Sequence, residues 1–101
     1  SGFGVGVGRV WAPAPASGGS QTDKSIQQAA DLYSQDRKQE ALDVLARAAK
    51  QDPADGRLYA KLILLNVELG NMVDAKDWAT EGKQKTRRHR GELDKALLEL
   101  Q

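Results

Sequence analysis

The feature that most constrains this 101-residue chain is an internal repeat with a period of 34 residues. Shifting the sequence by that amount places small residues on small residues and acidic residues on acidic residues. The matched pairs are Glu40 with Asp74, Ala41 with Ala75, Asp43 with Asp77 and Ala48 with Gly82. A period of this length holds two helices and the turn between them. The repeat therefore predicts antiparallel helical hairpins that stack against one another.

Apolar and small residues also follow helical spacing in five runs, each ended by a residue that breaks or caps a helix. The first run ends near Gln35, and Asp36 with Gln39 is the predicted cap of the second. Asp52-Pro53 closes the second run, and Gly70-Asn71 closes the third and caps the fourth. We therefore predict an all-α domain of about five helices over residues 21–101.

The fifth run forms one stripe of a C-terminal helix. Its members are Leu93, Ala96, Leu97 and Leu100. Two repeat units rarely cover their own apolar faces. We therefore expect this helix to pack on the fourth helix as a cap, or to mediate self-association through residues 93–100.

The resemblance to a known family rests on two segments. Residues 40–53, EALDVLARAAKQDP, and residues 59–75, YAKLILLNVELGNMVDA, resemble the tetratricopeptide repeat family. The resemblance covers residues 22–87, about two repeat units. Small residues are expected where the helices of each hairpin cross, at Ala29, Ala41, Ala48, Ala75 and Gly82. The chain departs from the family at Ile63, at Asn66 and at Arg87, where a second closing proline would fall.

In this family the first helix of each unit lines a concave groove. The residues that the resemblance places in the groove are Ile26, Ala30, Tyr33, Ala60, Leu64, Val67 and Glu68. The third helix is apolar on more than one side, as expected for a helix that is sandwiched or that awaits a partner. The predicted function is thus an adaptor or scaffold that binds a partner peptide or helix. The alternative is that the last helix buries Leu64 and Val67.

The composition gives no sign of an enzyme. There is no cysteine, and the single histidine, His89, lies within a run of basic residues. The glycines of residues 2–8 match neither common phosphate-loop pattern. We expect no catalysis, no cofactor and no metal site.

A basic cluster supports a different function. Its members are Lys83, Lys85, Arg87, Arg88 and Arg90. Such a cluster could bind nucleic acid or an acidic surface. Nucleic acid is the weaker expectation, because the net charge is only +1 and no aromatic residue is interleaved for base stacking. Alternatively, the two lysines complement the negative end of the fourth helix. A role as an appendage of a larger enzyme or secretion machine is a third option.

Residues 1–20 hold six of the ten glycines and two of the three prolines, which predicts a flexible segment. Its bulky apolar residues alternate with glycine, at Phe3, Val5, Val7 and Trp11. The strip could be a tethered peptide that docks or self-associates. It could instead be the end of a membrane anchor, because small residues recur four apart and Arg9 and Trp11 suit a membrane interface. Finally, it could be a disordered tail or a cloning remnant.

Localisation is not readable from the sequence. A membrane-spanning helix needs about 20 apolar residues, and the chain has no such run. We expect it to be soluble as given, either by itself or as the soluble part of a membrane-anchored assembly factor.

Overall fold

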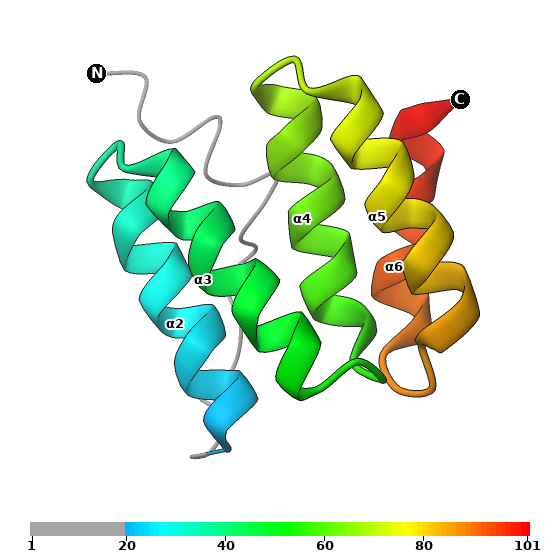
Figure 1. Ribbon diagram of the computed structural model, residues 1–101, viewed down its shortest axis with the longest axis horizontal. Helices are drawn as coiled ribbons and strands as arrows, with labels where there is room; N and C mark the ends of the chain where they lie inside the picture. The colour runs from blue at the N-terminus through cyan, green and yellow to red at the C-terminus, as the bar shows by residue number, and fades with distance from the viewer. Residues whose placement is uncertain (1–19) are drawn as a thin grey trace.

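The computed structural model describes residues 20–101, and over this range the chain is helical (Figure 1). The elements are α2 (Gln21–Ser34), α3 (Lys38–Gln51), α4 (Gly56–Glu68), α5 (Met72–Lys85), α6 (Arg90–Leu97) and the short 3₁₀-helix η1 (Leu98–Leu100). None of the described residues belongs to a strand. The predicted all-α class is confirmed. The predictions for Phe3, Val5, Val7 and Trp11 lie outside the described residues.

The turn between α2 and α3 differs from its prediction. Asp36 has a left-handed backbone with φ of 62°. The amides of Asp36 and Arg37 donate to the carbonyls of Tyr33 (3.0 Å) and Leu32 (2.9 Å), a pattern that terminates a helix. Arg37 occupies the N-cap position of α3 without a side-chain hydrogen bond. The predicted cap of Asp36 and Gln39 is therefore wrong, because Asp36 ends α2, in a conformation that a short polar side chain tolerates.

The turn between α4 and α5 follows its prediction. Gly70 has φ of 82°, and the amides of Gly70 and Asn71 donate to the carbonyls of Val67 (3.0 Å) and Asn66 (2.8 Å). Glycine suits this position because it adopts a left-handed backbone without steric cost. Asn71 then holds the N-cap position of α5, although its side chain makes no capping hydrogen bond.

α4 is the central helix of the domain. It stands between α3 and α5 in Figure 1 and is packed against α3, α5 and α6. Its buried residues are Gly56, Leu58, Tyr59, Ala60, Leu62, Ile63, Leu65 and Asn66. The apolar residues on several sides of this helix therefore serve several packing contacts at once.

Small residues lie buried at the predicted helix crossings. Ala29, Ala41 and Ala75 have no exposed surface. At the crossing of α4 and α5, a Cβ atom built on Gly82 would lie 2.9 Å from the Cβ of Tyr59. A larger residue at position 82 would force the two helices apart.

The C-terminal helix packs on a different neighbour from the one predicted. α6 lies mainly along α4 and has only limited contact with α5. Leu93 reaches α5, because its Cδ1 lies 3.2 Å from the Cβ position of Gly82. α5 offers few apolar residues, with only Ala75, Ala79 and Gly82 buried, whereas α4 has an apolar side left to cover. Leu93 is fully buried within the chain.

The loop between α5 and α6 is tied to the turn between α3 and α4. The amides of Arg87 and Arg88 both donate to the carbonyl of Ala54, at 2.8 and 2.9 Å, and the amide of Gly56 donates to the carbonyl of Arg88 at 2.8 Å. A proline at position 87 would lack this donor. A Cβ on Gly56 would lie 2.5 Å from the carbonyl oxygen of His89, so only glycine allows this approach.

Candidate functional site

α2 and α4 run in the same direction and are joined by side chains at both ends. Near their N-terminal ends, Arg57 Nη1 lies 2.9 Å from Asp23 Oδ1. Near their C-terminal ends, the Tyr33 hydroxyl donates to Glu68 Oε1 at 2.8 Å. These partners are 34 and 35 residues apart in sequence. The first spacing equals the repeat period and the second exceeds it by one residue, so corresponding parts of the two units face each other on this side of the molecule.

The N-terminal link is an ion-pair network centred on Arg57. Its guanidinium also lies 2.7 Å from Asp55 Oδ2, and Asp55 caps α4 by accepting from the amide of Arg57 at 2.9 Å. Asp55 is almost fully buried. Burial would raise the pKa of Asp55, but the hydrogen bonds and charge of Arg57 outweigh it and hold the pKa below its ordinary value.

The C-terminal link joins a tyrosine, a carboxylate and a lysine. Lys38 Nζ lies 2.9 Å from Glu68 Oε2 and 5.5 Å from the centre of the Tyr33 ring, within range of a cation–π interaction. Burial, together with the hydrogen bond to Glu68, raises the pKa of Tyr33 to about 12. Glu68, predicted to line the groove, is therefore held by two partners.

Between these links lies a half-buried apolar stripe. Ile26 and Ala30 follow Asp23 at helical spacing on α2, and Leu64 and Val67 occupy the matching part of α4. All four are neither buried nor fully exposed, and Ile26, Leu64 and Val67 pack on the core. We call these four residues the α2–α4 face. It has polar links at both ends.

Two of the predicted groove residues are not available for binding. Ala60 is 3% exposed and Tyr33 is 6% exposed. Ala60 is buried because α4 is packed by helices on three sides. The hydroxyl of Tyr33 is satisfied within the chain by Glu68. The predicted set is thus brought together, but only Ile26, Ala30, Leu64 and Val67 present apolar surface.

Half-buried Lys61 lies on the same side of α4, between Arg57 and Leu64. Burial is the main influence on this side chain and lowers the pKa of Lys61. The face therefore carries one charged group close to its apolar residues.

Most of the predicted basic cluster is engaged within the chain. Arg88 pairs with Asp52, and Lys85 pairs with Glu81 at 3.4 Å. Arg90 donates to carbonyls at the end of α5, at 3.3 and 3.5 Å. The contacts of Arg88 and Arg90 fasten the α5–α6 loop, whereas the Lys85–Glu81 pair lies within α5. All three reduce the positive charge that the cluster offers to a partner.

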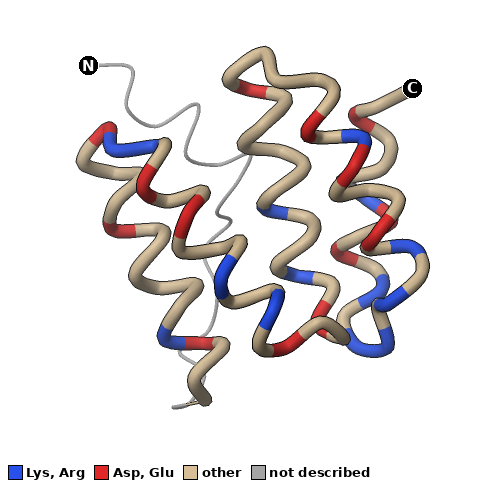
Figure 2. Tube along the Cα trace, in the orientation of Figure 1, with Lys and Arg blue, Asp and Glu red and all other residues tan. Residues whose placement is uncertain are grey.

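The basic cluster lies at one end of the molecule. Figure 2 shows Lys and Arg residues gathered where the α5–α6 loop lies, with acidic residues spread along α3 and α5. Among the described residues of the basic cluster, Lys83 and Arg87 are the two that make no side-chain ion pair. Two such charges are few for phosphate binding, since nucleic-acid sites commonly neutralise six to ten phosphates.

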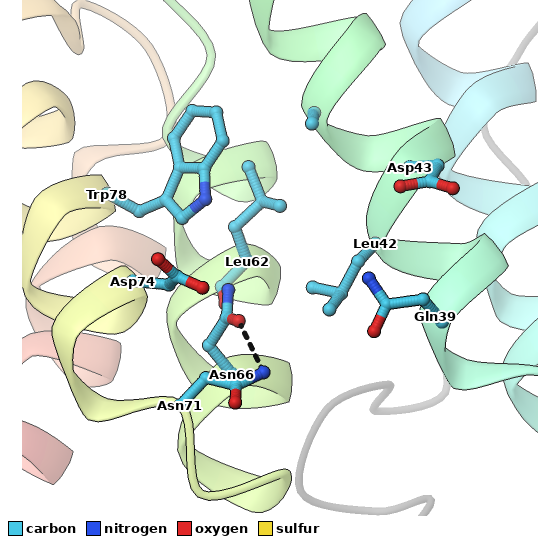
Figure 3. A pocket seen from close by; sticks show the side chains of 9 residues that line it. Gln39, Leu42, Asp43, Leu62, Asn66, Asn71, Asp74 and Trp78 are labelled. Atoms are coloured by element: carbon cyan, nitrogen blue, oxygen red, sulfur yellow. Dashed lines mark hydrogen bonds between the residues drawn. The ribbon is translucent and has the colours of Figure 1, made fainter.

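A cleft that the sequence analysis did not predict lies between α3 and α5, on the opposite side of α4 from Leu64. It has a volume of about 170 Å³ and its floor is formed by Leu62 and Asn66 of α4 (Figure 3). Asn66 is one of the departures from the family pattern, where a larger apolar side chain is usual. That departure was the available signal, because a shorter polar residue leaves space between neighbouring helices.

The walls of this cleft explain why we assign it no binding role. Asn66 is satisfied, because its Nδ2 donates to the carbonyl of Leu62 at 2.8 Å and its Oδ1 accepts from Asn71 at 3.4 Å. Asp74 lies in the first turn of α5, where a carboxylate favours the positive end of the helix dipole. Trp78 packs on Tyr59 with ring centres 6.2 Å apart. Each group thus has a structural use.

Residues 20–101 contain no cluster of three or more His, Asp or Glu that could hold a metal ion. No helix in this part of the chain is long and apolar enough to cross a membrane.

The chain matches no protein-family model, no curated protein and no solved structure in comparisons with known proteins. The resemblance to tetratricopeptide repeats consequently rests on the residues of the chain itself.

Proposed function

We propose that residues 21–101 form a non-catalytic protein-interaction module of the tetratricopeptide-like class. In this proposal the module is an adaptor or scaffold, and it binds an apolar peptide or helix of a partner protein on the α2–α4 face. The observation that carries the proposal is the half-buried stripe of Ile26, Ala30, Leu64 and Val67. Because the fold leaves this stripe only partly covered, a partner that covers it gains apolar burial.

The shape of the face favours an elongated ligand. α2 has 14 residues and is therefore about 21 Å long, at about 1.5 Å per residue. An extended peptide covers this length with about six residues, at roughly 3.3 Å each. The links of Arg57 and Glu68 bound the stripe at its two ends, because both side chains are engaged within the chain.

The alternative function, binding of nucleic acid or an acidic surface, has weaker support. It depends on the basic cluster, of which Arg88, Arg90 and Lys85 are engaged within the chain. Lys83 and Arg87 alone provide little positive charge for binding nucleic acid or an acidic surface. We therefore rank this function second.

The proposal can be tested by selecting ligands from a displayed library of random peptides on the full chain. We expect the selected peptides to be rich in apolar residues. We expect their binding to be lost in Leu64→Lys and in Ala30→Glu, which change the face from α4 and from α2 separately. Using two variants guards against a loss that merely reflects misfolding, and circular dichroism would verify the fold of each.

Val73→Lys is the matched control, because Val73 is 74% exposed on α5 and lies outside the face. It introduces the same charge as Leu64→Lys and is expected to bind like the parent. Selection of acidic peptides that require Lys83 and Arg87 would support the alternative function instead. Failure to select any peptide would contradict the proposal.

A further inference from the structure

The described chain begins at the end of the α2–α4 face where Arg57 links the two helices. Ser20 caps α2, because its hydroxyl accepts from the amide of Asp23 at 3.0 Å, and Asp23 is the residue that binds Arg57. The nineteen preceding residues are therefore attached beside the N-terminal end of the face. Any ligand in that segment is held close to the face by its covalent connection.

The length of the preceding segment is sufficient to cover the face. Residues 12–19 span up to about 26 Å when extended, at roughly 3.3 Å per residue. α2 itself is about 21 Å long. Residues 3–11 can thus be placed anywhere along the face.

The pattern of that segment suits docking to an apolar surface. Phe3, Val5, Val7 and Trp11 occupy alternate positions, and glycine occupies positions 2, 4, 6 and 8. In an extended chain, alternate residues point to the same side. One side would then carry Phe3, Val5, Val7 and Trp11 together with Arg9, and the other side would carry the four glycines and Val10.

We propose that residues 3–11 of this chain are a tethered ligand of the α2–α4 face and compete there with partner peptides. This inference rests on the proposed function in one respect, because both use the α2–α4 face as the binding surface. Glycine loses more conformational freedom on ordering than other residues, so the tethered segment is held weakly and a partner can displace it. It then lowers the apparent affinity of the face for partners without blocking it.

Trp11 fluorescence in the full chain carrying Trp78→Phe tests the inference, because Trp11 is then the only tryptophan. We expect blue-shifted emission, protection from a soluble quencher, and no change over a wide range of protein concentration. The emission is expected to shift to the red in Ala30→Glu and in Leu64→Lys, but to stay blue-shifted in the control Val73→Lys.

A second variant avoids any change to the folded domain. Phe3→Ser combined with Val7→Ser weakens the strip alone, and we expect it to expose Trp11 and to tighten binding of the library-selected peptides severalfold. If no peptide is selected while Trp11 is still protected, the proposed function is contradicted, but docking of residues 3–11 on the face is still supported.

Three results would overturn the inference. The first is a red-shifted and freely quenched Trp11 in the parent. The second is a blue shift that grows with protein concentration, which would make a second copy the acceptor. The third is a blue shift that appears only on addition of phosphatidylcholine vesicles, which would identify the strip as part of a membrane anchor.

Discussion

At the scale of single residues, the domain depends on a small network of polar side chains, centred on the buried Asp55, that joins the repeat units. Asp55 caps α4 and binds Arg57, and Arg57 also binds Asp23 across the repeat. A charge-assisted hydrogen bond of this kind contributes roughly 1.5 to 3 kcal/mol. These residues fix the relative position of α2 and α4, and so the width of the proposed binding face.

Asp55→Asn tests the contribution of this charge. We expect the variant to be roughly 1 to 3 kcal/mol less stable at neutral pH, because asparagine can still cap the helix but cannot pair with Arg57. The folded-state pKa of Asp55 is depressed, so its stabilisation is present above its unfolded pKa of about 3.9 and is lost as pH falls through the folded value. Denaturant unfolding across pH should show the parent and the variant converging below about pH 4. A constant difference at all pH values would contradict the assignment.

Thr86→Val tests the opposite case, a buried polar atom with no partner. Thr86 is 2% exposed, and its Oγ1 has no hydrogen-bond partner in the described structure. Removing such a group can stabilise a protein by about 1 kcal/mol, or roughly 4 to 8 °C in a domain of this size. Thr80→Val is the control, because Thr80 is exposed and its hydroxyl donates to the carbonyl of Lys76 at 3.1 Å. A lower melting temperature for Thr86→Val than for Thr80→Val would show that Oγ1 has a partner in solution.

At the scale of helices, the sequence predicted where most elements end and less of how they pack. The breaks at Asp52-Pro53 and Gly70-Asn71 were readable because proline and glycine restrict or permit specific backbone angles. Asp36 was misassigned, since aspartate serves both as an N-cap and as a left-handed residue at a helix end. The contact of α6 with α4 could not be read from local spacing, because it depends on which side of α4 the other helices leave uncovered.

Gly82→Ala tests the close crossing of α4 and α5. We expect net destabilisation, because the added methyl group meets the Cβ of Tyr59 at 2.9 Å, an atom that cannot move without its backbone. Overpacking costs roughly 1 to 3 kcal/mol and exceeds the helix propensity gained, which is up to about 1 kcal/mol. Gly91→Ala in α6 is the matched control, since nothing lies within 4 Å of its Cβ position, and it should be neutral or slightly stabilising. Equal melting temperatures for the two variants would contradict this packing.

At the scale of the whole molecule, two hairpins and α6 leave one apolar side partly uncovered. The family resemblance placed Ile26, Ala30, Leu64 and Val67 in one set, because helical spacing and the repeat together determine which positions share a side. The structure leaves all four half-buried on α2 and α4. It also named Ala60 and Tyr33, which are buried, because burial depends on neighbours far along the chain. The ion-pair network of Arg57 was missed, although opposite charges one repeat length apart were a readable signal.

Salt dependence separates the two proposed functions. Binding on the α2–α4 face is driven by apolar burial, so we expect the dissociation constant of a selected peptide to change little between about 50 and 200 mM salt. Binding of a phosphate backbone through the basic cluster would instead weaken by orders of magnitude over that range. Titration calorimetry at the two salt concentrations gives the comparison. A steep loss of affinity would favour the basic cluster.

The most direct test of the account is to map the binding site of a selected peptide by NMR on the isotope-labelled full chain. The account predicts that the methyl signals of Ile26, Ala30, Leu64 and Val67 shift most on titration, while those of Val73, on α5, stay in place. Perturbations centred on the α5–α6 loop, or on the cleft between α3 and α5, would contradict it.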